Sequence, residues 1–100
     1  MADKPQIIVS APAEADLQQV IDYLADQWSV EMSIKFIDRY FHKLDLIESM
    51  PGFGILSSKV PNVRKVKIDK YNVICYRVTD AEITILRILD TRSNPADNPY

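Results

Sequence analysis

Three short apolar runs between residues 63 and 89 dominate the hydrophobic pattern of this chain. They read VRKVKI, YNVICYRV and ITILRIL, and each is rich in β-branched or aromatic residues. Breaks of about two to four polar residues separate them, which is the usual length of a hairpin loop. The pattern therefore predicts a meander of three consecutive antiparallel strands.

The middle run of this meander is apolar on both of its faces. Side chains alternate along a strand, so Val73 and Cys75 share one face. Ile74, Tyr76 and Val78 share the other. A strand of this kind is usually central and covered twice. The helices of so short a chain can cover only one face well, so the other face requires a tail, a second chain or a partner.

Upstream of the meander, two segments carry apolar residues at helical spacing. A strand candidate at residues 6–9 precedes the first segment, and Ser10 and Pro12 are suited to cap and open a helix there. The second helix is predicted from about Val30 to Ser49. Only a few residues link the two helices, so they should form an antiparallel hairpin.

The aromatic residues of the helices fit the apolar stripes. This spacing predicts that Trp28 and Phe41 lie in the core rather than on a binding surface. Pro51 ends the second helix and opens the longest loop, at residues 51–62. The segment 90–100 contains two prolines, which exclude a regular helix or a central strand there.

The order of elements is strand, helix, helix, strand, strand, strand. This predicts an α+β fold, β-α-α-β-β-β, with an N-terminal helical hairpin packed on a small antiparallel sheet. The length of 100 residues suits a single domain over residues 1–100, ending in a tail at 90–100. Periodicity does not fix where the first strand joins the sheet.

Composition narrows the class of protein. No apolar run approaches the roughly 18 residues of a membrane span. The first six residues, MADKPQ, lack the apolar region of a secretory signal, so we expect a cytoplasmic protein with no membrane partner. Cys75 is the single cysteine and lies in an apolar strand, where a buried, inert thiol is expected.

The net charge of −2 is unevenly distributed. Residues 1–57 contain four Lys or Arg and nine Asp or Glu, a balance of −5, whereas residues 58–100 contain eight and five, a balance of +3. The helical half is therefore acidic and the sheet half mildly basic. This segregation is compatible with an anionic partner on the sheet side, and equally with solvated charges that happen to segregate.

The sequence lacks the residues that several kinds of functional site require. His42 is the only histidine and Cys75 the only cysteine, so no metal site is expected, and the sequence indicates no cofactor. The two glycines of PGFG do not lead into a phosphate-binding loop. A catalytic triad would have to use His42, which lies in the middle of an amphipathic helix.

Basic side chains remain as the candidates for function. Cross-strand neighbours in a meander can bring them together on one side, where they would bind phosphate or a carboxylate-rich partner. The alternative is that each cation keeps the sheet soluble and guards its edges. The candidates are Arg64, Lys65, Lys67, Lys70, Arg77, Arg87 and Arg92, with Tyr100 at the last position.

Taken in order, these segments resemble the RelE/ParE superfamily of toxins from type II toxin–antitoxin modules, often labelled plasmid stabilisation proteins. The matching stretches are AEADLQQVIDYL (13–24), PGFG (51–54), VRKVKIDKYNVICYRV (63–78) and ILRILDTRSNP (85–95). The resemblance implies the small α+β toxin fold, with two N-terminal helices on an antiparallel sheet. It also implies a cognate antitoxin whose extended or helical segment wraps the toxin.

Members of this superfamily divide by mechanism. RelE-like toxins cut messenger RNA in the ribosomal A site with Lys, Arg and Tyr side chains, and ParE-like toxins poison DNA gyrase. On the RelE pattern the catalytic residues of this chain would be Lys65, Lys67, Arg92 and Tyr100. Target or anion binding would fall to Arg64, Lys70, Arg77 and Arg87.

Two departures favour the ParE-like interpretation. Asn72 stands where RelE has an arginine, and the pI near 5.2 is unlike the basic character of a ribosome-entering nuclease. We therefore expect a growth inhibitor without enzymatic activity that acts on a protein target such as gyrase. The alternatives are a metal-independent, ribosome-dependent mRNA endonuclease and a non-toxic dimeric interaction module. A homodimer and a toxin–antitoxin hetero-oligomer both remain open.

Overall fold

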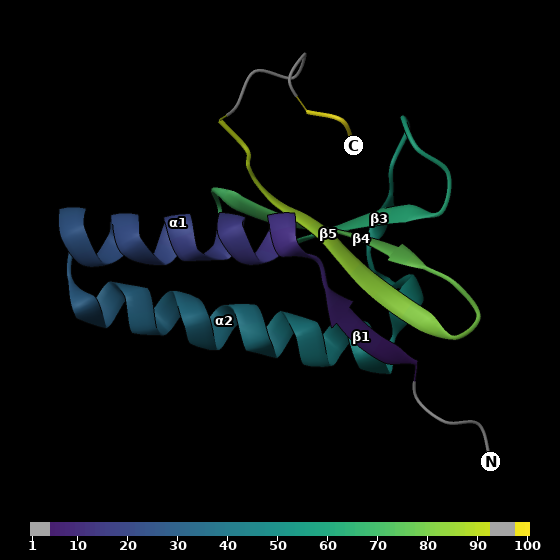
Figure 1. Ribbon diagram of the computed structural model, residues 1–100, viewed down its shortest axis with the longest axis horizontal. Coiled ribbons are helices and arrows are strands. Elements are labelled where there is room, and N and C mark those ends of the chain that lie inside the picture. Colours follow the sequence, from purple (N-terminus) through teal and green to yellow (C-terminus); the bar gives the residue numbers. More distant parts are fainter. Residues whose placement is uncertain (1–4, 93–97) are drawn as a thin grey trace.

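The computed structural model describes residues 5–92 and 98–100, and in them two long helices pack on a five-stranded sheet (Figure 1). In chain order the elements are β1 (Gln6–Val9), α1 (Ala11–Gln27), α2 (Val30–Ser49), a 3-10 turn η1 (Pro51–Phe53), β2 (Ile55–Leu56), β3 (Val63–Lys67), β4 (Asn72–Val78) and β5 (Glu82–Asp90). The predicted α+β fold, the helical hairpin and the meander are confirmed. The two-residue strand β2 was not indicated by the hydrophobic pattern.

The sheet is mixed, with strand order β1-β5-β4-β3-β2. The predicted meander forms its antiparallel centre, and β2 adds an antiparallel edge beside β3. β1 runs parallel to β5, with Ile7 opposite Ile83, because the helical hairpin and the meander intervene between the two strands. A register shift between Cys75 and Tyr76 of β4 marks a bulge in the β4–β5 ladder.

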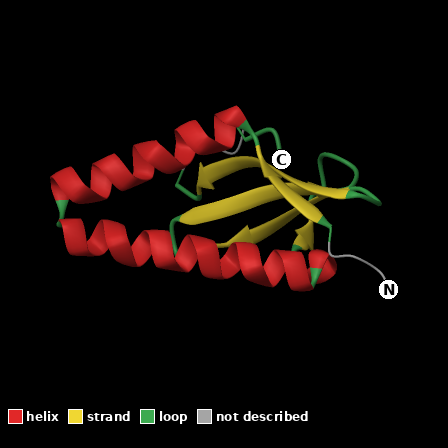
Figure 2. Cartoon of the chain, turned by 60° about the horizontal axis from the view of Figure 1, so that its bottom comes forward, coloured by secondary structure: helices red, strands yellow, loops and turns green. Residues whose placement is uncertain are grey.

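Both helices begin with a serine cap. The Ser10 hydroxyl accepts a hydrogen bond from the Ala13 amide at 3.2 Å, and the Ser29 hydroxyl accepts one from the Met32 amide at 3.1 Å. Each cap satisfies an amide that the first helical turn leaves without a partner. α1 ends at Gln27 and α2 begins at Val30, so the link between the helices is short, as the sequence predicted (Figure 2).

The main core lies between the helices and one face of the sheet. One stripe of α2, at a spacing of three or four residues, is buried there. Its large apolar members are Phe36, Tyr40, Leu44 and Ile47. The sheet contributes Val66, Ile68, Ile74, Tyr76, Ile83, Ile85 and Ile88. These residues come from β3, β4 and β5 and the residue after β3, and Ile7 and Val9 of β1 pack against them while partly buried.

The prediction that Trp28 and Phe41 lie in the core is wrong. Trp28 is 70% exposed and Phe41 is 56% exposed. Trp28 ends α1 at the tip of the hairpin, which projects past the strands in both views and so has no sheet beneath it (Figures 1 and 2). Phe41 follows the buried Tyr40 and therefore faces away from the buried stripe, although its ring meets the Tyr40 ring edge-on at 5.2 Å.

The second face of the sheet is covered by the chain itself. Val63 and Cys75 are fully buried, yet neither belongs to the helix-facing core, so the predicted burial of Cys75 is confirmed. The segment Asn98–Tyr100, here called the strap, is held beside this face. The Ser57 hydroxyl donates to the main-chain oxygen of Tyr100 at 2.6 Å, and the Lys59 ammonium donates to the Asn98 carbonyl at 2.7 Å. The strap therefore lies beside the second face, and both apolar residues there are buried within the chain itself.

The buried hydroxyl of Tyr76 fastens the loop that precedes β2. It donates to the Pro51 carbonyl at 2.8 Å and accepts from the Gly54 amide at 2.9 Å. A Cβ on Gly54 would lie 2.6 Å from this hydroxyl, so only glycine allows the approach. Arg64 also holds this loop, because it donates to the Gly54 carbonyl at 2.8 Å. This predicted anion-binding residue therefore has a structural role as well.

We predict that Tyr76→Phe lowers the free energy of unfolding by about 1–3 kcal/mol, because the Pro51 carbonyl and Gly54 amide lose a buried partner. Urea denaturation measures the loss. Tyr23→Phe is the matched control, since its ring is half exposed and its change should be within about 0.5 kcal/mol. Equal stability of the two variants would contradict a stabilising role of the hydrogen bonds between the Tyr76 hydroxyl and this loop.

Candidate functional site

Four of the candidate basic residues lie on the sheet face opposite the core, here called the basic face and defined by Lys65, Lys67, Arg77 and Arg87. The strand register places Lys65 opposite Cys75 and Cys75 opposite Arg87 in one row across the sheet. Lys67 pairs with Val73, and Arg77 pairs with Val63. The meander thus brings these four cations to one side of the sheet.

Among the residues that the structure describes, Arg87 is the member of the basic face that has a carboxylate partner. Its guanidinium donates from Nε and Nη2 to the two Asp16 carboxylate oxygens, at 2.7 and 3.0 Å. Asp16 also accepts the Ile88 amide at 3.0 Å. The hydrogen bond to Asp16 is the main cause that raises the pKa of Arg87, and Tyr100 adds a smaller electrostatic contribution. Arg87 therefore has less capacity to bind an external anion than its three neighbours.

The contact with Asp16 provides a hydrogen-bond partner for the backbone at the edge of β5. β1 pairs with β5 only as far as Ile85, so the remaining edge of β5 lacks a neighbouring strand. The Ser10 hydroxyl donates to the Leu86 carbonyl at 3.0 Å, and Asp16 accepts the next outward amide, that of Ile88. Side chains from the start of α1 therefore replace the missing strand.

A second basic group borders an open groove between the helical hairpin and the β3–β4 turn. The groove has a volume of about 780 Å³. Its aromatic wall consists of Tyr23, Trp28 and Tyr71, and all three side chains are exposed. Its cations are Lys35, Arg39, Lys70, Arg87 and Arg92. We call this feature the aromatic–basic groove.

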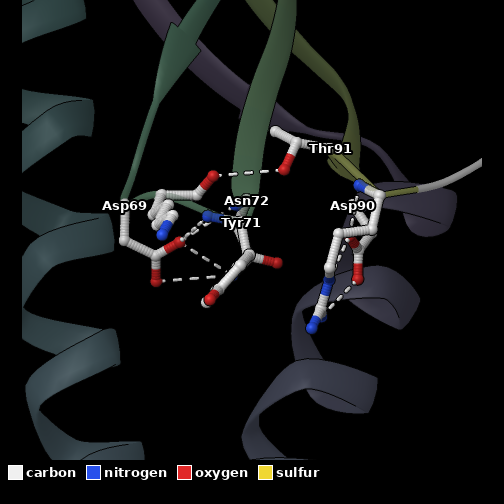
Figure 3. A network of polar contacts seen from close by, with 7 residues as sticks. Asp69, Tyr71, Asn72, Asp90 and Thr91 are labelled. Carbon is white, nitrogen blue, oxygen red and sulfur yellow. Dashed lines mark hydrogen bonds and ion pairs between the residues drawn. The ribbon is translucent and has the colours of Figure 1, made fainter.

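The β3–β4 turn at one side of the groove is built by a polar network (Figure 3). The Asp69 carboxylate accepts the amides of Tyr71 and Asn72 and the Asn72 side-chain amide, at 2.8–3.0 Å. Thr91 ties the end of β5 to this turn, because its amide donates to the Tyr71 carbonyl at 2.8 Å. Asn72, which departs from the RelE pattern, therefore has a structural role in this chain.

Arg92 stacks on the Tyr71 ring, with its guanidinium carbon 4.3 Å from the ring centre. The same guanidinium forms two hydrogen bonds to Asp90, at 2.8 and 3.0 Å. This pairing is the main cause that lowers the pKa of the Asp90 carboxyl. Lys70 lies over the same ring at 5.6 Å. The contacts of Arg92 and Lys70 therefore belong to the groove and its turn.

The residues of the predicted nuclease site make contacts in different places. Lys65 and Lys67 lie on the basic face, and Tyr100 lies in the strap. Arg92 is held by Asp90 and Tyr71 beside the groove. Their catalytic roles stay predictions. Sequence reasoning missed Asp16, Tyr23 and Tyr71; the position of Trp28 directly before the Ser29 cap was the available sign that it lies at a hairpin tip.

Within residues 5–92 and 98–100, no group of three or more His, Cys, Asp or Glu side chains could hold a metal ion. No helix in the same part of the chain is long and apolar enough to cross a membrane. The basic face and the aromatic–basic groove are both surfaces of a kind that suits contact with a macromolecule.

A helical hairpin on a mixed five-stranded sheet is the architecture that the resemblance to the RelE/ParE superfamily implied. The chain belongs to the ParE toxin family: the sequence model described as "ParE toxin of type II toxin-antitoxin system, parDE" matches residues 7–95. Toxin ParE1 of Mycobacterium tuberculosis (strain ATCC 25618 / H37Rv) is 26% identical over 87 residues, covering 85% of this chain and 88% of the relative.

Solved structures share the fold. The chromosomal ParDE TA system from P. aeruginosa contains a chain that matches with a TM-score of 0.74 and 24% identity, covering 87% of this chain and 96% of that one. The E. coli DinJ-YafQ toxin-antitoxin complex contains one that matches with a TM-score of 0.64 and 13% identity, covering 88% and 93%. The expected superfamily and fold are confirmed.

We predict that Asp16→Ala lowers the free energy of unfolding by about 2 kcal/mol. The substitution removes two charge-assisted hydrogen bonds and leaves the Ile88 amide without its partner, an effect discounted because the Arg87 side chain is 39% exposed. Asp22→Ala on the same helix is the control and should cost less than about 0.5 kcal/mol, because Asp22 is exposed. Urea denaturation that gives equal losses would contradict the role of Asp16.

Burial raises the pKa of the Cys75 thiol to about 11, against a small opposing effect of Lys65 and Arg87. The folded thiol therefore keeps its proton up to about pH 11, whereas an unfolded thiol loses it near pH 9. The contribution of the protonated Cys75 thiol to the free energy of unfolding is complete below pH 9 and is lost as the pH rises toward 11.

We therefore predict that, between pH 8.5 and 10.5, the free energy of unfolding of the natural chain falls by about 2 kcal/mol more than that of Cys75→Ala. Urea denaturation at the two pH values measures this difference, and the Ala variant serves as the control for all other titrating groups. Parallel pH dependence of the two proteins would show that the thiol ionises as readily in the fold as outside it.

Proposed function

We propose that this ParE family member inhibits growth by binding a protein target, DNA gyrase, and that a cognate antitoxin neutralises it. The match to the ParE family over residues 7–95 carries this proposal. Two structural neighbours, a ParDE system and a DinJ-YafQ complex, are toxin–antitoxin assemblies, which supports an antitoxin partner for this chain.

The aromatic–basic groove supports a protein ligand. Trp28, Tyr23 and Tyr71 are 70%, 51% and 42% exposed, although large aromatic side chains usually bury more of their surface. Arg39 and Lys35 stand beside them. Aromatic and arginine side chains contribute most of the binding energy at protein–protein interfaces, so this groove has the composition of an interaction surface.

A ribosome-dependent mRNA endonuclease is the second candidate. One observation favours it: Lys65 and Lys67 share the basic face, where they could bind phosphate. The arrangement of the other residues gives it less support, because Arg92 is paired with Asp90 and Asn72 is used to build a turn. An anion held by an arginine that already has a carboxylate partner must displace that partner first.

We predict that the purified protein inhibits DNA supercoiling by gyrase and leaves messenger RNA on translating ribosomes intact. Both reactions are measured side by side, with and without the product of an adjacent antitoxin gene, which should restore supercoiling. Messenger cleavage that is lost in Lys65→Ala and Lys67→Ala, with normal supercoiling, would instead establish the nuclease.

Variants of two exposed aromatic residues test whether the groove is the binding surface. Trp28→Ala should weaken gyrase inhibition about 30-fold, equivalent to about 2 kcal/mol at an interface hot spot. Phe41→Ala is the matched control, because Phe41 is similarly exposed but does not line the groove, and should change inhibition less than threefold. Equal effects of the two variants would contradict binding in the groove.

A further inference from the structure

A second apolar stripe runs along α2, on a side of the helix that the fold leaves exposed. Val30, Ile34 and Phe41 are 63%, 52% and 56% exposed, and the half-buried Ile37 stands between the last two. Ile34 and Phe41 each follow a residue of the buried stripe of α2, so they lie roughly 100° round the helix from it. We call Val30, Ile34, Ile37 and Phe41 the outer seam.

The spacing of the outer seam is that of a contact between two helices. Its members are separated by steps of four, three and four residues. An apolar repeat of about 3.5 residues keeps one stripe facing a second helix along its length. Apolar residues scattered singly over a surface need no explanation, whereas several on one stripe at this repeat form a patch that suits a partner. The spacing therefore indicates that a helix is the kind of partner that fits the seam.

An acidic row borders the outer seam. Glu31, Asp38 and Asp45 recur at intervals of seven residues, and all three are exposed. They occupy the flanking position of the repeat, where charge decides which helix can pair. In the part of the chain that the structure describes, no cation lies within ion-pair distance of any of the three. The row therefore presents uncompensated negative charge along one flank of the seam.

A second copy of this chain is a poor occupant of the seam. In an antiparallel two-fold pair of α2 helices the same flank of each helix meets, so the two acidic rows would face each other. In a parallel pair, the acidic row would meet the other flank of its partner, where Ser33, Tyr40 and Ile47 are buried in the body of the protein. Like charges brought together oppose association, so the acidic row selects against self-pairing.

We infer that the outer seam binds an amphipathic helix of another protein, whose own apolar stripe is bordered by lysine or arginine. The two apolar stripes would bury each other, and the cations would pair with the acidic row. The span from Val30 to Asp45 is a little over two heptads, roughly 24 Å of helix. No member of the seam lines the aromatic–basic groove, and the inference does not depend on the gyrase proposal.

Two synthetic peptides test this inference with the full chain. Both contain three heptads with isoleucine and leucine on one stripe. The residues on both sides of that stripe are lysine in the basic peptide and glutamate in the acidic peptide. Fluorescence anisotropy of each labelled peptide measures binding. We expect the basic peptide to bind at least 30-fold more tightly than the acidic peptide, and this preference to shrink in 1 M salt because ions screen the acidic row.

Charge reversals locate the surface that selects the peptide. Asp38→Lys with Asp45→Lys should weaken binding of the basic peptide at least tenfold and strengthen binding of the acidic peptide. Asp22→Lys with Asp26→Lys is the matched control, because it makes the same change of charge at exposed positions of α1. This control should leave the affinity for the basic peptide within threefold.

Apolar substitutions test the seam itself. Ile34→Ser with Phe41→Ser should weaken binding of the basic peptide at least tenfold, because the buried apolar contact is lost. Ile55→Ser with Leu56→Ser removes two exposed apolar side chains from β2 instead, and should leave binding within threefold. Urea denaturation of each variant accompanies these measurements, so that a loss of binding caused by unfolding is recognised.

Three results would overturn the inference. The first is equal binding of the basic and acidic peptides to the natural chain. The second is an equal effect of the charge reversals on α1 and α2, which would make the attraction a property of net charge alone. The third is a dimer of the natural chain in sedimentation that Ile34→Ser with Phe41→Ser dissociates, which would make a second copy the occupant of the seam.

Discussion

The whole arrangement depends on β4 being apolar on both faces. Ile74 and Tyr76 face the helices, and Cys75 faces the other way, and all three are fully buried. Burying apolar surface is worth about 25 cal/mol per Å², so leaving either face in water would remove a substantial part of the small net stability of a 100-residue domain. The helical hairpin covers the face of β4 that carries Ile74 and Tyr76. On the second face, Cys75 lies between Lys65 and Arg87 in the strand register, and long cationic side chains of this kind have aliphatic stems that can cover apolar surface.

This unequal cover explains where the chain is exposed. Two helices of 17 and 20 residues are longer than the sheet needs, so their linked ends extend past it and carry Trp28 into solvent. The groove forms where this overhang faces the β3–β4 turn, and the turn is stiffened by Asp69 and Asn72 rather than by apolar packing. A binding surface at that place needs no special element, because it follows from a mismatch between helix length and sheet length.

The sequence predicted what periodicity controls. The helix at Val30–Ser49 and the strands of the meander follow from spacing, and the cap at Ser10 follows from local chemistry. It did not predict β2, because two residues held by the Tyr76 hydroxyl and Arg64 carry no repeating pattern. Trp28 was misplaced because a stripe shows which residues share a helix face, and does not show where the opposing sheet stops. Asp16 was missed for a related reason: its partners lie about 70 residues away in sequence.

Arg87 connects the two surfaces that remain. Its backbone position is opposite Cys75, in the row of the basic face, while its side chain lines the groove and holds Asp16 of α1. The bidentate pair is partly exposed, so an acidic group on either surface can compete with Asp16 for the guanidinium. Loss of that pair would leave Asp16 bound only to the Ile88 amide, at the edge that β1 does not reach. The Arg87–Asp16 pair therefore joins the basic face, the aromatic–basic groove and the start of α1 at one point.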